Sequence, residues 1–197
     1  VGVSVTNGRG VAVEINSETD FVAKNADFQA LVRDVTALAL EVGESVDVVR
    51  GSRINGKTVD DVISEAVARI GENMTLRRAD AMSVSDGVVA SYLHNVAAEG
   101  MGKIGVLVAL ESEAGADVLE SLGKQIAMHI AAAFPLAQGQ RIDLLVDIPR
   151  EGGAFPVLAQ VEGATARTGI VLATPGAAVA RIAEDAGQAQ GLLDLAF

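Results

Sequence analysis

The chain has 197 residues, enough for one domain or two small ones with a hydrophobic core. Hydrophobic residues make up 50% of the sequence but aromatic residues only 3%, so the core must consist mainly of Val, Leu, Ile and Ala. The net charge of −11 disfavours nucleic-acid binding, because an acidic chain repels phosphate backbones. The absence of cysteine excludes disulfides and thiolate metal sites. No apolar run reaches the about 18–20 residues that a membrane helix needs, so we expect a cytoplasmic protein without membrane contacts.

The first part of the chain indicates a hairpin followed by a helix. Two β-rich runs, Val1–Thr6 and Val11–Ile15, flank Asn7-Gly8, a pair that tolerates the positive φ angles of a tight turn. A polar loop over residues 16–20 ends the second run. From about residue 25, apolar residues recur at three- and four-residue spacing and predict a helix whose buried face holds Phe28, Leu31, Val32, Val35 and Leu38.

A further helix is expected over Val59–Ile70. Thr58 and Asp61 have the spacing of a capping box at its start. Gly71 suits the left-handed conformation that often ends a helix.

Three strand candidates come next, at about 75–84, 88–93 and 103–110, with a turn at 85–87 between the first two. The last candidate is apolar on both faces, which is typical of a central strand. Short links between successive strands favour an antiparallel meander with helices on one side. A last clear helix is expected over Asp117–Ala133, because Phe134-Pro135 stops it. The predicted fold class is α+β, with antiparallel β-sheet subdomains and packed helices.

Composition shifts after this helix. All four prolines lie at or beyond Pro135, and no lysine follows Lys124. Weaker signals indicate strands at 142–148, 157–161 and 169–172 and a helix at 177–186. We therefore expect an N-terminal core subdomain over 1–120 and a C-terminal core subdomain over 121–197.

No catalytic arrangement is legible in the sequence. His94 and His129 lack the neighbouring His or carboxylate of a zinc-binding helix, and no Gly-x-Ser-x-Gly elbow is present. We expect no enzyme and no cofactor. His94 is expected in a surface loop, whereas His129 is either a half-exposed helix residue or a partner contact.

Asp20-Phe21 is unusual, because a large apolar ring follows an acidic loop directly before a helix. In one interpretation Phe21 is a hydrophobic staple that packs back on the helix. In the other it is an exposed aromatic anchor for a partner's pocket, and such rings often dominate the energy of an interface.

Four stretches resemble the signatures of one known family, elongation factor Ts. They occur in the family's order and rough spacing and cover about residues 1–135: Val13-Glu-Ile-Asn-Ser-Glu-Thr-Asp-Phe-Val-Ala-Lys-Asn25, Ile70-Gly-Glu-Asn-Met-Thr-Leu-Arg-Arg78, Gly102-Lys-Ile-Gly-Val-Leu-Val108 and Ile126-Ala-Met-His-Ile-Ala-Ala132.

The resemblance implies a guanine-nucleotide exchange factor that acts by binding elongation factor Tu during translation elongation. The segment Thr19, Asp20, Phe21 and Val22 would then insert between helices of the partner's GTPase domain, with Asp20 and Phe21 carrying most of the effect. This insertion would disturb the magnesium site and the phosphate-binding loop, so that GDP leaves. Met128 and His129 match a region that contacts the same partner. A homodimer is a further expectation that we keep open.

The sequence departs from the family's pattern at both ends. The family usually begins with a small helical domain, and its later part usually contains Met-Val-Glu-Gly-Arg and Gln-Pro-Phe stretches, which this sequence lacks. We therefore expect the chain to diverge from the family after about residue 135. The alternative function is a truncated or divergent elongation factor Ts-like interaction protein without efficient exchange activity.

Overall fold

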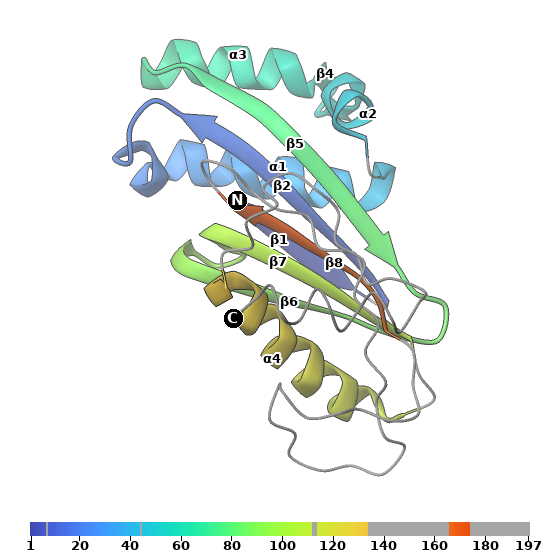
Figure 1. The fold of residues 1–197 in the computed structure, drawn as a ribbon. Coiled ribbons are helices and arrows are strands. Elements are labelled where there is room, and N and C mark those ends of the chain that lie inside the picture. Colours follow the sequence, from blue (N-terminus) through green and yellow to red (C-terminus); the bar gives the residue numbers. More distant parts are fainter. Residues whose placement is uncertain (7, 44, 112–113, 134–165, 174–197) are drawn as a thin grey trace.

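A computed structural model describes residues 1–6, 8–43, 45–111, 114–133 and the backbone of 166–173 (Figure 1). Within these residues the chain forms strands, four α-helices and one short 3-10 helix, η1. The elements in chain order are β1 (Gly2–Thr6), β2 (Arg9–Ser17), η1 (Val22–Lys24), α1 (Ala26–Val42), α2 (Val46–Gly51), β3 (Arg53–Ile54), β4 (Lys57–Thr58), α3 (Val59–Ile70), β5 (Met74–Ser83), β6 (Gly87–Ala98), β7 (Met101–Glu111), α4 (Ala116–Ala133) and β8 (Ala166–Ala173).

The main sheet is antiparallel, with neighbouring strands in the order β5-β2-β1-β7-β6 and with β8 paired to β7. This arrangement confirms the predicted α+β class and the hairpin of β1 and β2, although Asn7 of its turn lies outside the described residues. β7 is buried along 104–110, as its apolar sequence predicted.

The predicted meander is wrong, because β5 and β6 lie at opposite ends of the strand order despite their short link. β5 pairs instead with the free edge of β2, from Arg9↔Ser83 to Ser17↔Met74. At the end of the link, a Cβ on Gly87 would lie 1.9 Å from the carbonyl oxygen of Leu110, so only glycine fits this corner. The turn therefore carries the chain from β5, at one end of the strand order, to β6, at the other end.

Helices cover both outer sides of the folded sheet, so the expectation of helices on one side is also wrong (Figure 1). Alternate residues of β2 explain this arrangement. Val11, Val13 and Ile15 join the core beneath α1, α2 and α3, whereas Ala12 joins the core formed by β6, β7 and α4. β2 and β6 approach each other closely, since a Cβ on Gly10 of β2 would lie 2.6 Å from Cγ1 of Val89 in β6.

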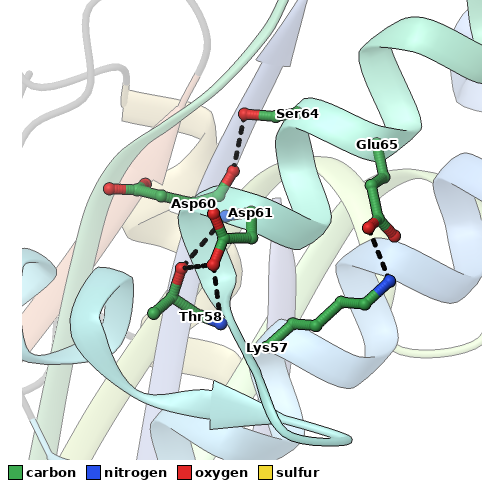
Figure 2. A network of polar contacts seen from close by, with 6 residues as sticks. All are labelled: Lys57, Thr58, Asp60, Asp61, Ser64 and Glu65. Atoms are coloured by element: carbon green, nitrogen blue, oxygen red, sulfur yellow. Dashed lines mark hydrogen bonds and ion pairs between the residues drawn. The ribbon is translucent and has the colours of Figure 1, made fainter.

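The helix predicted from about residue 25 begins where expected, and the helix predicted over Val59–Ile70 has both expected ends. The Asn25 side chain caps α1 by accepting hydrogen bonds from the backbone N–H groups of Asp27 and Phe28. The capping box of α3 is present, and Figure 2 shows Thr58 and Asp61 exchanging these contacts. Gly71 ends α3 with φ of 85°. The same start is tied to the helix body by Lys57, whose Nζ lies 2.5 Å from Oε1 of Glu65 (Figure 2).

Sequence reasoning missed α2 and the small β3–β4 hairpin. α2 has six residues and a single buried one, Val49, so it has no helical stripe to detect. The hairpin turns through Asn55 and Gly56, with φ of 52° and 85°. This Asn-Gly pair is the signal that could have revealed it.

The later part of the chain is described only at β8, which contains the strand predicted at 169–172. The pieces predicted at 142–148, 157–161 and 177–186 lie outside the described residues. The division into subdomains 1–120 and 121–197 stays a prediction.

Candidate functional site

The segment between β2 and α1 presents one large apolar side chain to solvent. Phe21 is 84% exposed, more than any other large hydrophobic residue among the described ones. Its neighbour Val22 is only 4% exposed and belongs to the same core as Phe28 and Leu31. Val22, not Phe21, therefore anchors the chain to the helix layer, and the staple interpretation of Phe21 is wrong.

The residues that precede Phe21 are braced by the loop between α3 and β5. Thr19 donates two hydrogen bonds to the carboxylate of Glu72, from its backbone N–H at 2.9 Å and from its hydroxyl at 2.6 Å. Next to it, Nδ2 of Asn73 donates to Oε1 of Glu18 at 2.6 Å. These contacts join parts of the chain that are more than fifty residues apart in sequence.

Asp20 forms an ion pair with a residue of β7. Its Oδ2 lies 3.1 Å from Nζ of Lys103, near the start of β7. The carboxylate side chain is 85% exposed, so water screens this ion pair and it adds little to stability. The pair nevertheless places the acidic group beside Phe21 and leaves it accessible to a partner.

Glu14 is a buried charged residue of β2, at the point where β2 pairs with β5. Its side chain is fully buried, and its two oxygens accept hydrogen bonds from Arg77 at 3.1 Å and from Nε of Arg78 at 2.5 Å. The register of β2 against β5 shifts at this point, between Glu14 and Ile15. The two guanidinium groups thus supply the charge and the donors that a buried carboxylate needs.

Met128 and His129 lie on α4, and both are exposed, Met128 at 47%. Ile126 and Ala127 of the same turn are buried against β6 and β7, so the helix presents one apolar and one accessible face. The C-terminal part of α4 and the segment between β2 and α1 lie at the same end of the molecule, on the left in Figure 1.

The other histidine has a different setting from the one expected. His94 is exposed, but it lies within β6, which extends to Ala98, and not in a loop. Its Nδ1 lies 3.1 Å from the hydroxyl oxygen of Tyr92 on the same strand. This pair has the geometry of a surface contact between alternate residues.

Sequence reasoning missed the bracing residues Glu18, Glu72, Asn73 and Lys103. Their signal was present, because Glu72 and Asn73 lie in the second of the four resembling stretches and Lys103 lies in the third. Three stretches that are far apart in sequence therefore meet around one loop.

Comparison with known proteins finds the same family that the four stretches resemble. The family model described as "Elongation factor TS" matches residues 18–142. Curated relatives named elongation factor Ts include those of Paracoccus denitrificans, 62% identical over 135 residues, and Nitrobacter hamburgensis, 54% identical over 137 residues. These matches cover 68% and 70% of this chain but only 44% and 45% of the relatives. The relative from Zymomonas mobilis is 57% identical over 138 residues, with 70% of this chain and 45% of that protein covered.

The chain thus spans less than half the length of these curated relatives. In the part of the chain that the structure describes, no helix has both the length and the apolar character needed to cross a membrane. The matched region includes the exposed Phe21, its bracing residues and α4. The chain belongs to the elongation factor Ts family.

Proposed function

We propose that the chain binds elongation factor Tu and promotes the release of GDP from it. Family membership supports the translation role, and the resemblance of the Thr19–Val22 segment to the family's signature supports the exchange activity. The single observation that carries the proposal is the 84% exposure of Phe21 beside the buried Val22. A braced aromatic ring in solvent is suited to enter a pocket on a partner.

Each predicted site residue has a role in this proposal. Phe21 enters between helices of the partner's GTPase domain, and the exposed carboxylate of Asp20 accompanies it. Thr19 and Val22 hold the segment in place, because Thr19 is bonded to Glu72 and Val22 is buried. On α4, the accessible face that carries Met128 and His129 provides a second contact with the same partner.

The proposed mechanism is thermodynamic linkage and needs no covalent step. If the bound chain weakens GDP binding by some factor, GDP must weaken binding of the chain by the same factor. Nucleotide that returns to elongation factor Tu then expels the chain, and the chain acts again.

The direct test is the release rate of a fluorescent GDP analogue from elongation factor Tu, measured against the concentration of the chain. The proposal expects the rate to rise and then to saturate. A rate that stays at the spontaneous value at every concentration would refute exchange activity.

A second candidate function is that of a divergent elongation factor Ts-like interaction protein, which binds elongation factor Tu without efficient exchange. The observation behind it is that the family match ends at residue 142 of this chain. Measured binding without faster GDP release would select this function. Sedimentation of the chain alone, at several concentrations, would test the expected homodimer.

A further inference from the structure

We propose that Glu72, assisted by Asn73, is a positioning residue that holds the tip loop, residues 18–21, in the shape that exposes Phe21. This inference rests on the proposed function, because it assigns the bracing a role in partner binding. Glu72 is half-buried, and both of its carboxylate oxygens accept hydrogen bonds from Thr19. One acidic side chain therefore fixes both the backbone and the side chain of the same loop residue.

Side-chain hydrogen bonds continue the pairing of β2 and β5 beyond the last backbone pair. Ser17↔Met74 is the last backbone pair of β2 and β5. The next residues outward are Glu18 and Asn73, whose side chains bond at 2.6 Å, and beyond them Thr19 meets Glu72. The antiparallel register thus extends two residues past the sheet through side chains. A loop that would otherwise leave the sheet edge freely keeps the direction of β2.

The end of α3 supplies the geometry for this extension. Gly71 adopts a left-handed conformation with φ of 85° and ends the helix directly before Glu72. A residue with a side chain is strained at such a φ, so glycine permits the reversal that brings residues 72 and 73 beside the loop.

The effect on Phe21 follows from the fixed points on each side of it. Thr19 is bonded to Glu72, and Val22 is buried in the core, so only Asp20 and Phe21 lie between two attached residues. Lys103 restrains Asp20 as well. A ring presented in this way loses little conformational freedom when a partner binds it, and such preorganisation strengthens binding without adding a contact.

The bracing hydrogen bonds are largely exposed, so their loss should loosen the loop and leave the fold intact. The test compares Glu72→Ala with Glu65→Ala as a matched control. Glu65 is an exposed glutamate on the neighbouring helix and pairs with Lys57, away from the loop. The first measurement uses the chain alone and follows hydrogen exchange of the Thr19 amide by NMR.

We expect the Thr19 amide to exchange about tenfold faster in Glu72→Ala and unchanged in Glu65→Ala, with similar melting temperatures. An unchanged Thr19 amide would overturn the bracing, whatever the chain does to elongation factor Tu. Global loss of protection together with a large fall in melting temperature would also overturn it, because Glu72 would then support the whole fold.

The second measurement is GDP release from elongation factor Tu at increasing concentrations of each variant. For Glu72→Ala we expect the half-saturating concentration to rise about three- to tenfold while the plateau rate stays within about twofold, because the ring makes the same contacts once it is seated. An unchanged half-saturating concentration would overturn the positioning role. A wild-type chain without exchange activity would overturn the proposed function and this role together, and the hydrogen exchange data would still report whether Glu72 braces the loop.

Discussion

Replacing Phe21 with alanine separates a binding role of the ring from a structural one. The ring is 84% exposed, so folding buries only a small part of its area. If a phenylalanine buries about 200 Å², the buried remainder is about 30 Å², which contributes less than about 1 kcal/mol to stability. We therefore expect the melting temperature of Phe21→Ala to fall by only a few degrees.

The expected effect on binding is larger. Seating the exposed part of the ring in a partner's pocket would bury about 170 Å², and truncation of such a residue typically costs about 2–4 kcal/mol. This corresponds to a roughly 30- to 700-fold loss in affinity, since about 1.4 kcal/mol is a factor of ten. The assay is the acceleration of GDP release per unit concentration of the chain, measured well below saturation.

Val48→Ala is the matched control for this change. Val48 is also an exposed hydrophobic residue, at 49%, but it lies on α2, away from the end of the molecule that carries the loop (Figure 1). We expect Val48→Ala to release GDP as fast as the wild type does. Equal activity of Phe21→Ala and the control, or a fall in melting temperature of more than about ten degrees for Phe21→Ala, would refute the reasoning.

Three further changes test the core residue next to the loop, the buried carboxylate of β2 and the capping box at the start of α3. Val22→Ala removes buried methyl groups and should destabilise the fold by about 2 kcal/mol in urea unfolding, whereas an unchanged midpoint would show that Val22 is not the anchor. Glu14→Gln leaves two guanidinium groups without their buried carboxylate and should cost about 2–4 kcal/mol by the same measurement; no loss would show that the buried charge is dispensable. The hydroxyl and then the backbone N–H of Thr58 hold the pKa of Asp61 below its ordinary value of 3.8, so the stabilising contact is present above that pH and is lost as pH falls through the lower folded value. The stability difference between wild type and Asp61→Asn should therefore shrink only below about pH 4, and a difference that shrinks near neutral pH would contradict this assignment.

The local elements could be predicted where one feature decides the structure. The apolar spacing of α1 and the Thr58–Asp61 capping box are properties of adjacent residues, and both are present in the structure. Strand order could not be predicted in the same way. The short link at 85–87 is compatible with a hairpin, and the choice of β2 as the partner of β5 depends on which apolar faces the two cores cover.

The residues of the candidate site could be named from the sequence, but the orientation of their side chains could not be predicted from it. Phe21 and Val22 are adjacent apolar residues, and nothing local states which of them turns inward. The structure buries Val22 because η1 directs it toward Phe28 and Leu31, and it leaves Phe21 outside. The bracing by Glu72 depends on a contact across fifty-three positions, which periodicity and motif spacing do not report.

The central claim is that binding of the chain to elongation factor Tu and binding of GDP to it weaken each other. The most direct measurement is the affinity of the chain for nucleotide-free and for GDP-loaded elongation factor Tu, under one set of conditions. Linkage predicts weaker binding to the GDP-loaded form, by the same factor with which the chain weakens GDP binding. Equal affinities for the two forms would contradict the account, because a ligand that does not distinguish them cannot drive exchange.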